Sequence, residues 1–161
     1  MRRVLAVMSV VLSLAASAAA AGEPPSGWRP PSSEERSRHP SPDRLVATGD
    51  FDGDGRADRA VLLVNDRLDQ IGLFVVRGGS DRYEALDTVD EAWRLPDVSV
   101  SAEEPGLFRT ACAKGYGPPC ARDEPTQVET KQVSIGLTYA ESSFSIFHWD
   151  GRGFAQVWIT D

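Results

Sequence analysis

The chain has 161 residues, two cysteines and a formal net charge of −7 at pH 7. An acidic surface of this kind repels nucleic acid and anionic lipid, which argues against both as partners. The length is sufficient for one folded domain with a single core, together with shorter flanking segments.

The first 21 residues have the three-part pattern of a secretory signal peptide. Arg2 and Arg3 form a basic region, residues 4–14 are mostly apolar, and small residues follow as far as Ala21. The apolar run is too short for a transmembrane helix, which needs about 20 apolar residues. We therefore expect cleavage after Ala21, a periplasmic or secreted protein and no membrane span. Loss of Arg2 and Arg3 takes the formal charge from −7 to −9.

Residues 22–43 contain six of the eleven prolines and show almost no apolar periodicity. Serine, glutamate and arginine occupy many of the other positions. A segment of this composition is expected to bury too little apolar surface to offset its chain entropy. We therefore predict a disordered leader, with the folded domain over residues 44–161. His39 lies in this segment and is not expected to bind a ligand.

The first part of the folded domain has the pattern of short strands. Turn-forming Gly, Asp and Asn residues separate four apolar or mixed runs, which cover residues 45–48, 60–64, 71–77 and 82–86. Runs of this length between turn signals predict an antiparallel meander.

The last part of the domain also predicts strands. Residues 132–139 alternate between polar and apolar, as in a strand with one buried face. Residues 143–149 and 154–160 flank an Asp150-Gly151 pair, which favours a tight hairpin. The fold class we expect is all-β, with antiparallel meander sheets that form a small sandwich or partial barrel.

Cys112 and Cys120 bracket the short sequence AKGYGPP. An exported protein folds in an oxidising compartment, and the spacing fits neither a CxxC redox pair nor a zinc knuckle. We expect a disulfide, which on the chain-entropy argument stabilises the protein by roughly 2.5 kcal/mol. A surface loop held in this way is a candidate binding site.

Residues 48–64, TGDFDGDGRADRAVLLV, place four aspartates directly before an apolar strand. Two carboxylates held about 5 Å apart at an effective dielectric near 20 repel by about 3 kcal/mol, so the loop favours a bound cation. The D-x-D-x-D-G-x-x-D order is typical of a calcium loop with oxygen ligands. The candidate ligands are the side chains of Asp50, Asp52, Asp54 and Asp58 and the main-chain carbonyl of Arg56.

Two alternatives to a calcium loop remain open, namely a Mg²⁺ site and a turn that binds no ion. An EF-hand would require a glutamate where Val61 already belongs to the strand, so that motif does not apply. Mg²⁺ fits less well than Ca²⁺, because it demands octahedral geometry and retains water. The other alternative is an Asp- and Gly-rich turn that binds no ion.

The stretch GDFDGDGRADRAVLLV resembles the calcium loop of FG-GAP (VCBS-type) repeats, the blades of integrin-alpha-like β-propellers. The resemblance covers residues 45–86, where the four expected strands match one blade. It implies that Asp50, Asp52, Asp54 and Asp58 bind Ca²⁺ through side chains and Arg56 through its carbonyl. A single loop of this kind predicts one blade-like unit with a C-terminal hairpin, and not a full propeller.

The sequence contains no nucleophile elbow, zinc-protease motif, P-loop or dinucleotide fingerprint. His148 lies in an apolar strand between two aromatic residues, where we expect a hydrogen-bonded strand residue rather than a general base. The acidic pairs Glu103-Glu104 and Asp123-Glu124 lie next to prolines and are expected in solvated loops. We therefore expect that the protein is not an enzyme.

Three functional hypotheses follow. The first is an exported, monomeric calcium-binding β-domain with a binding or structural role, whose partner is a protein or glycan. The second is an inhibitor of a secreted enzyme such as a lysozyme, because an acidic surface suits a basic target. The third, a hydrolase that uses calcium-bound water, is disfavoured because four carboxylates would leave the ion little Lewis acidity.

Overall fold

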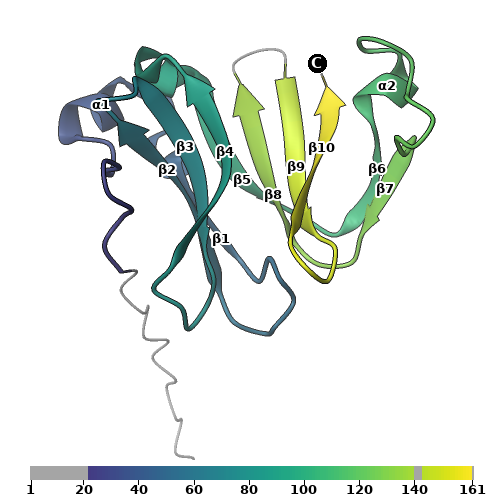
Figure 1. The fold of residues 1–161 in the computed structure, drawn as a ribbon, viewed down its shortest axis with the longest axis horizontal. Helices are drawn as coiled ribbons and strands as arrows, with labels where there is room; N and C mark the ends of the chain where they lie inside the picture. Colours follow the sequence, from purple (N-terminus) through teal and green to yellow (C-terminus); the bar gives the residue numbers. More distant parts are fainter. Residues whose placement is uncertain (1–21, 140–142, 161) are drawn as a thin grey trace, which may run out of the picture.

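The computed structural model describes residues 22–139 and 143–160, so the predicted signal peptide lies outside the described residues. The protein is an all-β sandwich built from antiparallel sheets, as predicted (Figure 1). None of the helices in the described ranges is long and apolar enough to cross a membrane.

The first sheet is a meander in which consecutive strands are neighbours, in the order β1-β2-β3-β4. Its strands are β1 (Val46–Gly49), β2 (Asp58–Asn65), β3 (Gln70–Val76) and β4 (Tyr83–Asp90). The central strands β2 and β3 are buried on both faces. Leu62 pairs with Leu73 on the core side, and Val61 pairs with Phe74 on the outer side.

The second sheet has the order β10-β9-β8-β5. Its strands are β5 (Val98–Glu103), β8 (Ser134–Tyr139), β9 (Ser143–Trp149) and β10 (Phe154–Thr160). A 3₁₀ helix, η2 (Ala92–Asp97), leads into β5. The predicted hairpin joins β9 to β10, where Gly151 has a φ of 96° and Asp150 accepts main-chain hydrogen bonds from Arg152 and Gly153.

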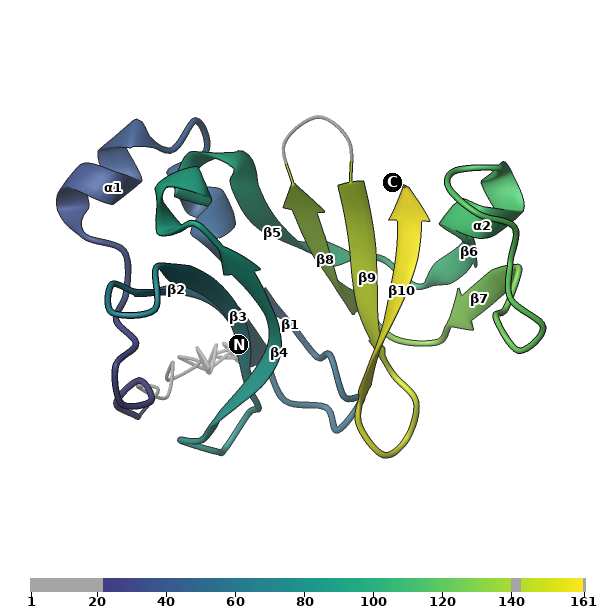
Figure 2. The same ribbon diagram turned by 45° about the horizontal axis from the view of Figure 1, so that its top comes forward.

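A smaller unit lies beside the second sheet. It contains β6 (Gly106–Arg109), β7 (Gln127–Thr130) and the short helix α2 (Ala111–Lys114). Figure 2 shows β6, β7 and α2 on the side of β10 that faces away from the first sheet. The Lys114 ammonium donates to the carbonyl of Ile159 at 2.9 Å, which connects α2 to β10.

The hydrophobic core lies between the inner faces of the two main sheets, and β1 contacts β5 where the sheets meet. Each sheet contributes every second residue, as expected for strands that bury one face against the other layer. The main contributors are Leu62, Ile71, Leu73, Val75, Val98, Val100, Ile135, Leu137 and Phe147.

Residues 22–43 do not form the disordered leader that their composition predicts. They contain α1 (Ser33–Arg38), whose first turn carries a capping box, and the segment continues into η1 (Pro42–Leu45). His39 is only 3% exposed. Its Nε2 donates to the carbonyl of Val98, and its Nδ1 accepts from the main-chain N–H of Ser41.

Arg29 connects the N-terminal segment to the first sheet through main-chain hydrogen bonds and an ion pair. The backbone of Arg29 exchanges both hydrogen bonds with Val64, where β1 no longer covers the edge of β2. The Arg29 guanidinium pairs with Glu35 at 2.8 Å and with Asp66 at 2.6 Å. The hydrogen bond from Arg29 holds the pKa of Glu35 down to about 2.

Trp28 covers the outer face of the first sheet. Its ring contacts the Phe74 ring edge-on, with 4.9 Å between centroids. A Cβ atom at Gly72 would lie 2.7 Å from the Trp28 ring, so only glycine leaves room for it. Tyr83 contacts Phe74 from another side. A few specific contacts therefore order a segment whose average composition indicates disorder.

We expect Trp28→Ala to lower the free energy of unfolding by about 2 kcal/mol, because it uncovers the outer apolar cluster. Trp93→Ala is the matched control, since the Trp93 side chain is 70% exposed. The control should change stability by no more than about 0.5 kcal/mol. Urea unfolding followed by circular dichroism measures both. A loss of less than about 0.5 kcal/mol in Trp28→Ala would show that Trp28 does not support the sheet.

Candidate metal centre

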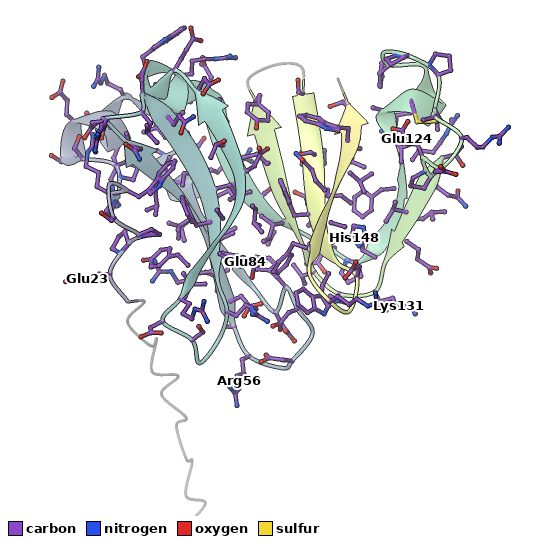
Figure 3. All side chains as sticks on the ribbon, viewed as in Figure 1. Glu23, Arg56, Glu84, Glu124, Lys131 and His148 are labelled. Atoms are coloured by element: carbon purple, nitrogen blue, oxygen red, sulfur yellow. A yellow bond between two sulfur atoms is a disulfide. The ribbon has the colours of Figure 1, made fainter. Side chains whose placement is uncertain are left out.

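Residues 50–57 join β1 to β2, and we call them the acidic loop. The side chain of Arg56 lies at the tip of this loop, as labelled in Figure 3. Phe51 anchors the loop, because its ring is completely buried in the core. Gly53 and Gly55 have φ values of 76° and 84°, a region that side chains disfavour. The main-chain N–H of Asp54 donates to Asp52 Oδ1. The loop thus turns sharply between β1 and β2.

Three of the four predicted carboxylates come together in this loop. Asp50, Asp52 and Asp58 each offer an oxygen that lies within 4.8 Å of the others. Asp50 Oδ2 accepts a hydrogen bond from the main-chain N–H of Gly55 at 2.9 Å. Asp50 Oδ1 is buried and has no hydrogen-bond partner in the described chain. A cation between the carboxylates would supply that missing partner.

Asp58 is the most buried member of the group, with 0% exposure. Its Oδ2 accepts from the N–H groups of Phe51 and Asp52, and its Oδ1 accepts from Gly78 at 2.6 Å. Burial raises the pKa of Asp58, and these main-chain donors oppose that shift. Its carboxylate therefore joins the acidic loop to the turn between β3 and β4.

Asp54 and Arg56 lie on the exposed part of the loop. Asp54 is outside the group of three, and its Oδ1 accepts from the main-chain N–H of Arg56 at 2.8 Å. The Arg56 side chain extends over the turn between β3 and β4. Its Nη1 would lie 2.7 Å from a Cβ atom added at Gly79 in that turn. The predicted ligands thus divide into a buried trio and an exposed tip.

Arg77 is a neighbour of the site that the sequence did not indicate. Its guanidinium lies 3.8 Å from Asp52 and 3.9 Å from Glu84. It also lies over the ring of Trp149, 5.6 Å from the centroid. Because Trp149 belongs to β9, this cation links the acidic loop to the second sheet. No local sequence pattern predicts that Arg77 lies beside Asp52 and Trp149.

A cavity of about 360 Å³ lies next to the acidic loop. The β7–β8 connection and the β9–β10 hairpin line it, and a Cβ atom added at Gly53 of the acidic loop would lie 3.6 Å from the Gln132 side chain. His148 is half-buried on the cavity wall, and Figure 3 shows it near Lys131. The expected side-chain hydrogen bond of His148 is not found within residues 22–139 and 143–160. His148 therefore has no described group that would orient it as a general base.

The predicted disulfide is confirmed: Cys112 and Cys120 are bonded, with 4.9 Å between their Cα atoms. The bond closes the loop that begins at α2. It indicates that the protein matures in an oxidising, extracytoplasmic environment.

We expect Asp58→Asn to destabilise the protein by about 2 kcal/mol, because an amide cannot accept all of the hydrogen bonds that this buried carboxylate accepts. Asp54→Asn is the matched control, since its remaining oxygen can still accept from the Arg56 N–H. The control should change stability by less than about 0.5 kcal/mol. Urea unfolding with excess chelator excludes any contribution from a cation. Similar losses in both variants would contradict the assigned role of Asp58.

The chain was compared with family models, curated proteins and solved structures, and none of them matches it. The resemblance of the acidic loop to an FG-GAP repeat therefore stays a prediction.

Proposed function

We propose that this protein is an exported, calcium-stabilised β-sandwich that acts by binding a partner and not by catalysis. The observation that carries the calcium assignment is the convergence of Asp50, Asp52 and Asp58 around a buried Asp50 oxygen that has no hydrogen-bond partner. Charge repulsion and an unsatisfied acceptor at one point both favour a cation.

Calcium suits this donor set better than other common cations. All the candidate donors are oxygens, and Ca²⁺ accepts six to eight oxygen ligands in flexible geometry. Asp54 and the Arg56 carbonyl, at the exposed tip, complete the proposed set. The ion would reinforce the loop beside Arg77, where the two sheets are linked, so its proposed role is structural.

Export to the periplasm or the medium is supported by two independent features. One is the basic, apolar and small-residue pattern of residues 1–21. The other is the Cys112–Cys120 disulfide, which persists in oxidising compartments.

A binding role is supported by the surface near the disulfide. The large side chains of Tyr116 and Trp158 are 48% and 43% exposed there. Exposed aromatic residues beside a braced loop are typical of contact surfaces. Inhibition of a basic secreted enzyme, such as a lysozyme, is a second candidate, because the acidic chain and the braced loop favour such a target.

We expect calorimetry to show one bound Ca²⁺. If the dissociation constant is about 0.1 mM, then 1 mM Ca²⁺ stabilises the fold by about 1.4 kcal/mol. Thermal unfolding with calcium or with chelator measures this difference. Asp50→Asn should remove the response to calcium, whereas Asp123→Asn, in a loop outside the site, should retain it. The absence of heat at millimolar calcium would contradict the metal assignment.

Affinity capture from an envelope extract, with the exported chain as bait, tests whether a partner binds. We expect a specific protein or glycan to be retained in calcium and released or weakened by chelator. Assay of the captured protein, including lysozyme activity, separates inhibition from simple binding. Turnover of a substrate by the bait itself would contradict the non-catalytic role.

A further inference from the structure

A groove lies between the disulfide-braced loop and β10. Its volume is about 240 Å³, and Cys112, Tyr116, Pro118, Glu124 and Trp158 are among its lining residues. We call it the loop groove. It is separate from the acidic loop: Figure 3 shows Glu124 near α2 and Arg56 at a different end of the molecule.

Two large aromatic side chains line the loop groove. Tyr116 and Trp158 are both partly exposed, at 48% and 43%. The Trp158 ring is held in place, because it stacks on Tyr139 with an interplanar angle of 25° and 6.3 Å between centroids. An aromatic wall of fixed orientation loses little entropy when a ligand packs against it.

A single carboxylate completes the loop groove. An oxygen of Glu124 lies within 4.8 Å of both sulfur atoms of the disulfide. Glu124 Oε2 accepts from the main-chain N–H of Ala121, and Glu124 forms no ion pair within the described ranges. Arg109 and Lys114, just before and at the end of α2, donate to main-chain carbonyls. The carboxylate is therefore free to receive a cation from outside.

Aromatic faces beside one carboxylate match an arginine side chain better than other groups. The guanidinium is planar, stacks on aromatic rings and forms directed hydrogen bonds to carboxylates, whereas lysine is a hydrated point charge. The protein contains the same combination internally, since Arg77 lies over Trp149 and beside Glu84. The expected mature chain, with a formal charge of −9, would attract a basic partner.

We propose that the loop groove binds an arginine side chain presented by a basic partner protein. This inference rests on the proposed partner-binding function and names the chemistry of the partner. The aliphatic part of the arginine contacts Pro118 and the disulfide, and its guanidinium lies between the aromatic residues and Glu124.

The test uses capped tetra-arginine and tetra-lysine peptides with the full mature chain. Tetra-arginine should bind more tightly than tetra-lysine and should shift the NMR signal of the Trp158 indole N–H. Loss of a charge-assisted hydrogen bond in Glu124→Gln should weaken tetra-arginine binding about tenfold. Glu104→Gln, which removes the same charge outside the groove, should leave binding within about twofold. Tyr116→Ala tests the aromatic wall without disturbing the stack of Trp158 on Tyr139.

Four results would overturn the proposal: no binding at about 10 mM peptide, equal affinity for both peptides, an unchanged Trp158 signal, or equal losses in the two glutamine variants. Affinity capture with Glu124→Gln separates this inference from the proposed function. If the variant retains the partner as well as the parent does, partner binding stands and the loop groove is not its site. If the parent captures nothing, the binding function itself is wrong.

Discussion

The buried carboxylate of Asp58 is the constraint on which the acidic-loop end of this structure depends. A charge without solvent exposure is costly unless hydrogen bonds compensate for it. Here main-chain N–H groups from Phe51, Asp52 and Gly78 do so. To donate these bonds, the β1–β2 loop must fold back onto the start of β2, and the β3–β4 turn must approach it. The shape of the acidic loop follows from that requirement.

This loop geometry brings Asp50 and Asp52 close to Asp58 and creates local repulsion. Arg77 offsets part of it and carries the connection to Trp149 in the second sheet. A calcium ion in the proposed position would neutralise the remainder beside the contact between sheets. The proposed ion would stabilise the scaffold, while the loop groove near α2 would present the proposed contact surface. Stability and recognition would then occupy separate parts of the molecule (Figure 3).

The N-terminal segment shows how composition and specific contacts can disagree. Its prolines and charges predict disorder, because average hydropathy contains no information about individual partners. In the structure, Trp28 packs on Phe74 and Arg29 pairs with Asp66, both across a long sequence separation. Arg29 also pairs with Glu35 within the segment. The contacts of Trp28 and Arg29 with the first sheet require the finished sheet, so residues 22–43 alone could not indicate them. The capping box of Ser32 and Glu35, in contrast, is a local pattern that indicates the start of α1.

The sequence by itself determined the β class, the β9–β10 hairpin and the disulfide, because alternation, turn residues and cysteine spacing act over short ranges. It also indicated which aspartates are candidates for a cation site. Only the tertiary structure decided that Asp50, Asp52 and Asp58 converge while Asp54 lies outside them. The tertiary structure also decided the position of Arg77, and it placed Glu124 and Trp158 in the wall of one groove. The groups around Arg77 and in the loop groove come from strands and loops that are distant in sequence and become neighbours only in the folded chain. The Asp58 carboxylate likewise takes one of its hydrogen bonds from the distant Gly78.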